Sequence, residues 1–178
     1  FAPPHNGHIA AARAFIEQMK LDELLIIPAG IPPHKLIDSS DEPEHRLRMC
    51  TLAFSGIDKV KVSDMEIVRG GRSFTVDTLR ELTEPDRKLL LLCGTDMMLT
   101  FDEWREFETI FGLCTPVYIR RENDCALDEK IIEKNNEYYK KYGVAFRKIV
   151  ADPIVVSSTE IREKIKAGDD ISDYVPVK

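Results

Sequence analysis

The stretch His5-Asn6-Gly7-His8 stands at the beginning of an amphipathic run that starts at Ile9. It combines two imidazole side chains, a glycine that lets the backbone approach a ligand closely, and the positive end of a predicted helix dipole. The preceding Phe1-Ala2-Pro3-Pro4 contains prolines that fix φ, so the loop reaches the helix in one defined pose. These residues predict a binding site for an anion such as a nucleotide's phosphates. A simple helix cap is the alternative for an isolated tetrapeptide.

The residues that follow predict a helix and then a buried strand. Apolar side chains recur at three- and four-residue spacing from Ile9 to Met19, which predicts a helix over residues 8 to 20 with one buried face. The next segment, Leu24-Leu25-Ile26-Ile27, is a continuous apolar run closed by a proline and a glycine. Such a run is typical of a strand that is buried on both faces of a parallel sheet.

The same alternation continues along the chain and predicts an α/β fold. Apolar runs recur at 60–62, 89–93 and 116–119, and helical patterns at 43–55, 75–83, 103–112 and 128–142. This order is typical of a doubly wound parallel sheet with right-handed crossovers, here in a single domain over residues 1–178. Such a sheet needs a strand and a tight glycine turn ahead of its first phosphate-binding helix. We therefore expect that Phe1 is not the biological start and that the first strand is missing from the chain.

Ligands of doubly wound sheets lie beyond the carboxyl ends of the strands, and three motifs follow predicted strands. They are Pro28 to Lys35, Gly94-Thr95-Asp96, and Ser157-Ser158-Thr159 after the apolar Ile154-Val155-Val156. Ser157 and Glu160 form a capping-box pattern that opens a helix ending near Gly168. The start of that helix also carries Arg162, so N–H groups, hydroxyls and a guanidinium can converge on one anion. A purely structural cap is the alternative.

The composition limits the classes of partner. The chain carries 25 Lys and Arg against 31 Asp and Glu, a formal net charge of −6, so its overall field repels nucleic acid. A mononucleotide can still bind where a local cluster is positive, as His5, His8, His34, Lys35 and Arg162 are expected to make it. No apolar run approaches the roughly 18 residues of a membrane span. We expect a cytoplasmic protein without membrane or nucleic-acid partners.

The four cysteines are Cys50, Cys93, Cys114 and Cys125. They form no C-x-x-C pair and have no metal-ligand spacing with the four histidines. Cys93 and Cys114 lie in or beside apolar runs. We expect buried, reduced thiols, which fit a reducing cytosol better than a disulfide scaffold, and no metal site built from protein residues.

The chain resembles a known enzyme family at five places in the same order. Residues 1–8 resemble the second half of the T-F-x-P-x-H-x-G-H signature of the nucleotidylyltransferase superfamily. Four further stretches resemble its nicotinate-nucleotide adenylyltransferase branch: Ile31-Pro32-Pro33-His34-Lys35, Gly71-Arg72-Ser73-Phe74-Thr75-Val76-Asp77-Thr78-Leu79, Gly94-Thr95-Asp96 with Trp104 close behind, and Val156-Ser157-Ser158-Thr159-Glu160-Ile161-Arg162. Ala2 and Phe74 depart from that branch, which often has Asp and Tyr there. Neither position is expected to take part in the chemistry.

The resemblance implies a Rossmann-like fold and the transfer of AMP from ATP to nicotinate mononucleotide, which yields deamido-NAD and pyrophosphate in NAD biosynthesis. It implies catalytic roles for His5, His8, Lys35 and Arg162. It implies ATP binding by Gly7, Gly94, Asp96, Ser157, Ser158 and Thr159, and mononucleotide binding by Thr75 and Trp104. The indole is expected to stack on the pyridine ring, with packing at the edge of the core as the alternative.

Adenylyl transfer needs alignment more than proton transfer. The attacking phosphomonoester has a second pKa of about 6, so it is largely a dianion at neutral pH and requires no general base. The protein has to align two anions that repel each other and stabilise charge on the bridging and leaving oxygens. We assign His5 and His8 to that stabilisation. Mg²⁺ is the expected cofactor, carried mainly by the ATP phosphates, because no carboxylate cluster resembles a dedicated cage.

Other functions stay open at this point. Transferases that adenylate phosphopantetheine or cytidylylate an alcohol phosphate share residues 5–8, but they give no reason for the Thr75 and Trp104 segments together. A class I aminoacyl-tRNA synthetase fragment has a similar H-I-G-H motif, although this chain lacks a Lys-Met-Ser-Lys-Ser stretch. A non-catalytic nucleotide sensor on the same fold is a further alternative, and intact His5, His8 and Arg162 count against it because those groups matter most when charge develops at transfer. A homo-oligomer is compatible with the sequence, which does not set the preference for the acid over the amide mononucleotide.

Overall fold

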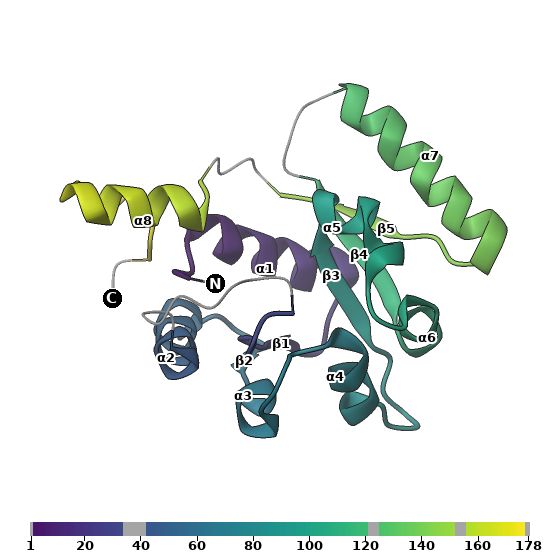
Figure 1. Cartoon of the computed structure of the whole chain (residues 1–178), viewed down its shortest axis with the longest axis horizontal. Coiled ribbons are helices and arrows are strands. Elements are labelled where there is room, and N and C mark those ends of the chain that lie inside the picture. The colour runs from purple at the N-terminus through teal and green to yellow at the C-terminus, as the bar shows by residue number, and fades with distance from the viewer. Residues whose placement is uncertain (1, 34–41, 121–124, 152–155, 177–178) are drawn as a thin grey trace. The chain divides into compact units, whose positions relative to one another are not determined.

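The computed structural model of the chain describes residues 2–33, 42–120, 125–151 and 156–176 (Figure 1). The chain forms two compact units, of which the first consists of Phe1–Ser73 and Asp152–Lys178 and the second of Phe74–Ala151. Each unit contains parallel strands and helices, so the predicted α/β class is confirmed. That residues 1–178 make a single domain stays a prediction.

The first unit contains a two-stranded parallel sheet. Its elements are α1 (Asn6–Met19), β1 (Leu24–Ile26), α2 (Pro43–Phe54), β2 (Val60–Val62), α3 (Met65–Arg69) and α8 (Ser158–Ala167). Strands β1 and β2 pair with Leu24 opposite Val60 and Ile26 opposite Val62. Helix α1 buries Ala11, Ala12 and Phe15 on one face, so two of the apolar positions in the predicted spacing are buried. Ile9, Ile16 and Met19 of that spacing are half-buried.

The second unit contains a three-stranded parallel sheet in the order β3-β4-β5. Its elements are α4 (Thr75–Leu82), β3 (Leu90–Gly94), α5 (Thr95–Leu99), the 3₁₀ helix η1 (Phe101–Glu103), α6 (Phe107–Leu113), β4 (Thr115–Arg120), α7 (Cys125–Tyr142) and β5 (Arg147–Val150). The central strand β4 is almost fully buried, as its continuous apolar run predicts.

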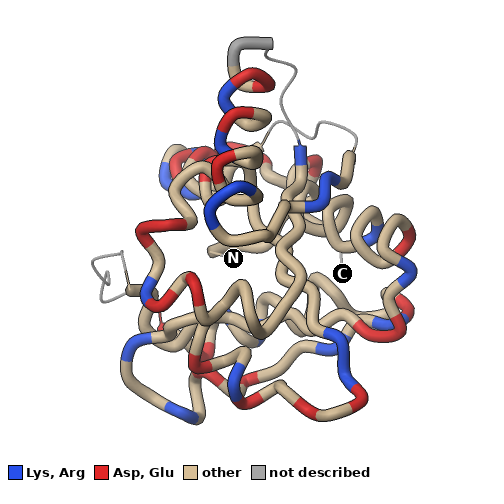
Figure 2. The backbone as a smooth tube through the Cα atoms, turned by 90° about the vertical axis from the view of Figure 1, so that its right-hand side faces the viewer, with Lys and Arg blue, Asp and Glu red and all other residues tan. Residues whose placement is uncertain are grey.

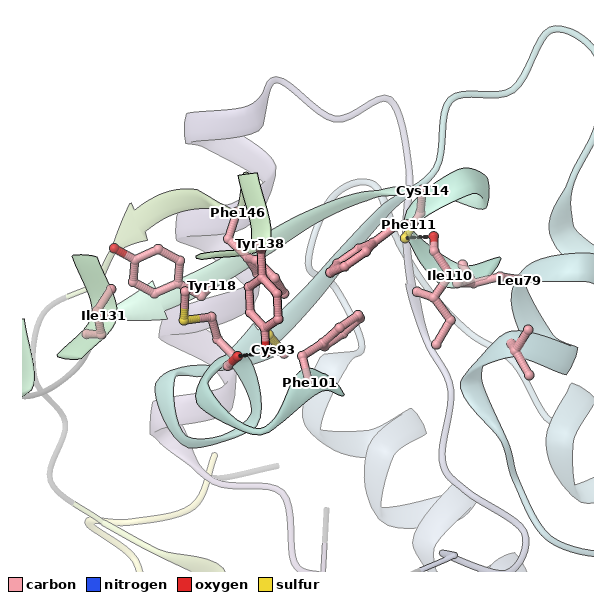
Figure 3. Close-up of a cluster of buried hydrophobic side chains, with 12 residues drawn as sticks. Leu79, Cys93, Phe101, Ile110, Phe111, Cys114, Tyr118, Ile131, Tyr138 and Phe146 are labelled. Carbon is pink, nitrogen blue, oxygen red and sulfur yellow. Dashed lines mark hydrogen bonds between the residues drawn. The ribbon is translucent and has the colours of Figure 1, made fainter. Parts of the chain in front are cut away.

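Aromatic side chains form much of the core of the second unit (Figure 3). The ring of Phe101 lies 5.2 Å from that of Phe111 and 5.1 Å from that of Phe146, and the ring of Tyr138 lies 5.6 Å from both of the latter. Offset and edge-to-face pairs at these separations add to the free energy gained by burying the rings. The packing ties η1, α6, α7 and the segment before β5 to one another.

The structure corrects several predicted boundaries. Helix α1 begins at Asn6 rather than at His8, because His5 already serves as its N-cap residue. The helix predicted over 103–112 begins only at Phe107, because Trp104 is extended and Glu106 has a positive φ of 52°. Of the predicted apolar segment 154–156, only Val156 lies within the described residues.

Three elements carry no clear sequence pattern. Helices α3 and α5 have five residues each, which is too short for a helical period to appear. Strand β5 buries only Ile149 and has charged residues before it, so it does not form an apolar run. It is an edge strand of its sheet, where charged residues are common.

The three cysteines whose side chains the structure describes, Cys50, Cys93 and Cys114, are buried free thiols, as predicted. Burial raises the pKa of Cys50 to about 11, and the pKa values of Cys93 and Cys114 to about 12. The side chain of Cys125 lies outside the description. Basic and acidic residues are interspersed along the described backbone (Figure 2), and no helix within it is long and apolar enough to cross a membrane.

The backbone that follows β1 is held from several sides. Gly30 donates its N–H to the hydroxyl of Ser73 at 2.8 Å, and the N–H of Ser73 donates to the carbonyl of Ile31 at the same distance. The buried guanidinium of Arg46 donates to the carbonyls of Ala29 at 2.5 Å and Gly30 at 2.6 Å. These bonds fix the backbone at the carboxyl end of β1.

Gly30→Ala is expected to lower the free energy of unfolding by about 1–3 kcal/mol, the usual cost of overpacking. A Cβ at this position would lie 2.9 Å from the carbonyl oxygen of Glu66, so backbone would have to move. Gly112→Ala in α6 is the control, because nothing lies within 4 Å of its Cβ and alanine favours a helix. Urea unfolding measures both, and a Gly30→Ala protein as stable as wild type would contradict the close contact.

Candidate active site

The first turn of α1 carries both histidines of the predicted site. His5 is the N-cap residue, with extended backbone and a buried side chain, and its N–H donates to Nδ1 of His8 at 3.2 Å. The two imidazole rings lie 3.7 Å apart. Because Nδ1 of His8 accepts this hydrogen bond, Nε2 is the ring nitrogen that can act as a donor. Gly7 lies between them and is buried.

The start of α8 is a capping box, as predicted. The N–H of Glu160 donates to the Ser157 hydroxyl at 3.1 Å, and the N–H of Ser157 donates to the Glu160 carboxylate at 2.7 Å. The helix ends at Gly168 with a positive φ of 79°, also as predicted. The hydroxyl of Ser157 therefore has a structural partner, and its contact with ATP stays a prediction.

Hydrogen bonds join the starts of α8 and α1. The hydroxyl of Ser158 donates to the carbonyl of Pro3 at 2.9 Å, and the guanidinium of Arg162 donates to the carbonyl of Ala2 at 2.6 Å. Arg162 also donates to the hydroxyl of Thr159 at 3.0 Å, which leaves further N–H groups of the guanidinium for a ligand. Two helix N-termini and a guanidinium thus lie in one region, a combination that favours a polyanion.

The predicted residues of the second unit lie at a strand end and at a helix start. Gly94 ends β3 and caps α5, and Asp96 is exposed in the first turn of that helix. The buried hydroxyl of Thr95 between them donates to the carbonyl of Ile119 at the end of β4. Thr75 is the first residue of α4. The carboxyl end of a parallel strand is where ligands of such sheets bind.

Trp104 is half-buried, and its ring stacks on that of Phe101 with the centroids 4.7 Å apart and an angle of 28° between the planes. The next residue, Arg105, places its guanidinium 4.5 Å from the ring centroid of Phe74, the N-cap residue of α4. The segment of Trp104 and the start of α4 are therefore neighbours. One face of the indole packs on the core, and its predicted contact with a pyridine ring stays a prediction.

Lys35, with His34, lies outside the described residues, although Gly30 and Ile31 before it are well fixed. Sequence analysis missed Arg46 and Ser73, which hold that backbone. The sequence does indicate the role of Arg46, because it shares the buried face of α2 with Cys50, Ala53 and Phe54. A charged residue at a core position indicates a specific polar partner. The described residues contain no group of three His, Cys, Asp or Glu side chains that could hold a metal ion.

Residues 1–164 match the model of the cytidylyltransferase-like family, which covers both candidate helix starts and both sheets. The chain therefore belongs to this family of nucleotidyltransferases. A nicotinate-nucleotide adenylyltransferase of Clostridium botulinum (strain Kyoto / Type A2) is 36% identical over the whole chain and 89% of its own length. Another of Clostridium tetani is 33% identical, with the same coverage. Within the family, the chain belongs with the nicotinate-nucleotide adenylyltransferases.

Solved structures support the fold. A Plasmodium falciparum nicotinic acid mononucleotide adenylyltransferase complexed with NaAD has a TM-score of 0.72 at 19% identity, covering 98% of this chain and 86% of that one. The same enzyme complexed with APC has a TM-score of 0.65 at 18% identity and the same coverage. The Rossmann-like nucleotidylyltransferase fold predicted from the sequence is confirmed.

Glu160→Ala is expected to lower the melting temperature at pH 7 but to have less effect as the pH falls below about 4. Hydrogen bonds to the side chain and backbone of Ser157 hold the pKa of Glu160 below its ordinary value. A carboxylate with a lowered pKa stabilises the folded state above its unfolded pKa of about 4.3, and this contribution disappears as the pH falls through the folded pKa. Thermal unfolding from pH 7 to pH 3 measures the trend.

Glu163→Ala is the control for that series, because Glu163 is exposed on the same helix and takes no part in the capping box. Its effect on the melting temperature at pH 7 is expected to be smaller. Identical pH trends for the two variants would show that the capping box contributes nothing.

Proposed function

We propose that the protein transfers the AMP moiety of ATP to nicotinate mononucleotide and releases pyrophosphate, forming deamido-NAD for NAD biosynthesis. The observation that carries this proposal is the 36% identity over the whole chain with a nicotinate-nucleotide adenylyltransferase. The hydrogen-bonded helix starts of α1 and α8 supply a chemical reason, because ATP brings a triphosphate that needs several donors.

The first unit would hold the triphosphate. In this proposal the N-terminus of α8, with Ser158, Thr159 and Arg162, binds the β- and γ-phosphates, while Nε2–H of His8 donates where charge develops during transfer. The nucleophile is a phosphate oxygen of the acceptor, which attacks the α-phosphorus in line with departing pyrophosphate. Since the acceptor is already an anion at neutral pH, the imidazoles act as fixed donors rather than as bases.

The second unit would hold the acceptor and the ribose. Asp96 in the first turn of α5 can accept from ribose hydroxyls, and Gly94 at the end of β3 allows close approach of the backbone. The N-terminus of α4, where Thr75 lies, suits the nicotinate carboxylate. The exposed face of the Trp104 indole suits the pyridine ring. Lys35 would add a cation near the reacting phosphates.

Mg²⁺ is proposed as a cofactor that arrives with ATP. The described residues provide no cage of carboxylates for it, whereas Mg²⁺ readily keeps phosphate oxygens and water as ligands. We also propose a cytoplasmic location and small-molecule partners, without nucleic acid or membrane. The net charge of −6 supports this, because it disfavours contact with polyanions.

Pyrophosphate release from ATP tests the proposed acceptor. With nicotinate mononucleotide, nicotinamide mononucleotide and phosphopantetheine offered separately, the first is expected to be clearly preferred, because a helix N-terminus favours a carboxylate over a neutral amide. Equal turnover of phosphopantetheine would overturn the choice of acceptor. Absence of turnover with every acceptor, while ATP still binds, would favour a nucleotide sensor.

His8→Ala is expected to lower kcat about 10²- to 10³-fold, the usual effect of losing one preorganised donor, and to change the KM for the mononucleotide little. His45→Ala is the control, because His45 is exposed on α2. Steady-state kinetics of pyrophosphate release measure both variants. A His8→Ala enzyme with near-normal kcat and a raised KM would show that the residue only holds substrate.

A further inference from the structure

The side chain of Tyr138 on α7 places a polar group inside an aromatic core. The residue is 0% exposed, and its ring packs against Phe111 and Phe146 (Figure 3). Its hydroxyl lies 3.1 Å from the carboxylate of Asp102 and 3.3 Å from the carbonyl of Met98, and it accepts from the N–H of Asp102 at 3.3 Å. A phenylalanine would fill the same space but would lack these hydrogen bonds.

Lys134, one turn earlier on α7, contacts the same carboxylate. Its Nζ donates to Asp102 at 2.8 Å, and it lies 5.0 Å from the ring centroid of Tyr138. Burial raises the pKa of Tyr138 to about 12, so the hydroxyl keeps its proton at neutral pH. Burial opposes ionisation of Asp102, but hydrogen bonds from Lys134 and Tyr138 lower its pKa overall, so the carboxylate stays charged.

The carboxylate that Tyr138 and Lys134 of α7 contact belongs to Asp102, which lies in the segment that ends at Trp104. Asp102 lies in η1, and the N–H of Trp104 donates to the carbonyl of Phe101 in the same helix at 3.1 Å. The indole itself rests on the Phe101 ring. Fixing Asp102 therefore fixes the backbone that sets the position of the indole and the ring on which it packs.

The residues that follow Trp104 are held by a contact that is expected to be weaker. Arg80 of α4, 47% exposed, donates to the carboxylate of Glu106 at 2.5 Å. The similarly exposed carboxylate of Asp102 is instead held by the buried Tyr138 and by Lys134, which is 20% exposed. Exposed ion pairs usually contribute little, whereas hydrogen bonds to a charged group at the edge of the core contribute more. The contacts from α7 are therefore the ones expected to set the position of Trp104.

We propose that Tyr138 and Lys134 are positioning residues, which act through Asp102 to hold the indole of Trp104 where the pyridine ring of the acceptor stacks. This inference rests on the proposed function. It adds that α7, which carries none of the residues assigned to substrates, determines affinity for the mononucleotide while leaving ATP binding unchanged. Both residues touch Asp102 and neither needs to touch a ligand.

The chain has a single tryptophan, so its fluorescence reports on Trp104 alone. Tyr138→Phe and Lys134→Met are expected to increase the quenching of this fluorescence by acrylamide in the ligand-free protein. The matched controls are Tyr139→Phe and Lys140→Met on the exposed side of the same helix, where Tyr139 is 63% exposed. The controls are expected to give the wild-type signal.

Kinetics supply the second readout. Tyr138→Phe is expected to raise the KM for nicotinate mononucleotide about 2- to 10-fold, the equivalent of one hydrogen bond, without changing the KM for ATP. Trp104→Ala gives the upper limit, while Trp104→Phe keeps an aromatic face and retains most of the affinity. In the double variant of Tyr138→Phe with Asp102→Asn, the two effects are expected not to add, because both act through one contact.

Several outcomes would overturn the inference. One is wild-type quenching and KM in both α7 variants, and another is an equal rise in the KM values for ATP and for the mononucleotide, which indicates general destabilisation. If wild-type protein does not use nicotinate mononucleotide, the proposed function fails, and the role toward the pyridine ring fails with it. Quenching in the ligand-free variants then decides separately whether α7 positions Trp104.

Discussion

The hydrogen bonds from the start of α8 to the carbonyls of Ala2 and Pro3 are the interaction on which the candidate site depends. They span 155 and 160 residues of sequence and bring a second helix N-terminus beside the first turn of α1. One helix N-terminus attracts an anion modestly. Two of them, with a guanidinium and the Nε2–H of His8, offer enough donors for a chain of phosphates.

The residues proposed to bind phosphate also have structural roles. Arg162 and Ser158 bond to backbone carbonyls, and Ser157 closes a capping box. These contacts restrict the side chains before any ligand arrives, so less conformational entropy is lost when phosphate binds. Preorganised donors of this kind are what transfer between two anions requires.

The second unit uses an aromatic core to support the half-buried indole of Trp104. Trp104 is extended, and Glu106 adopts a left-handed backbone conformation, so the segment between η1 and α6 departs from helical geometry. Side-chain contacts from α7 and α4 reach Asp102 and Glu106 at its two ends. Sequence periodicity predicts one continuous helix there because it does not detect such a break, which depends on partners 36 and 26 residues away.

The sequence by itself determined the alternation of strands and helices apart from α3, α5 and β5, the capping box of α8 and the glycine that ends it, and the position of His5 and His8 at a helix start. These features depend on backbone hydrogen bonds between near neighbours and on the periodic burial of apolar side chains. Only the tertiary structure decided that Arg46 is buried, that Arg162 bonds to Ala2, and that Tyr138 reaches Asp102. Such pairs leave no local pattern, because they are set by how distant segments pack.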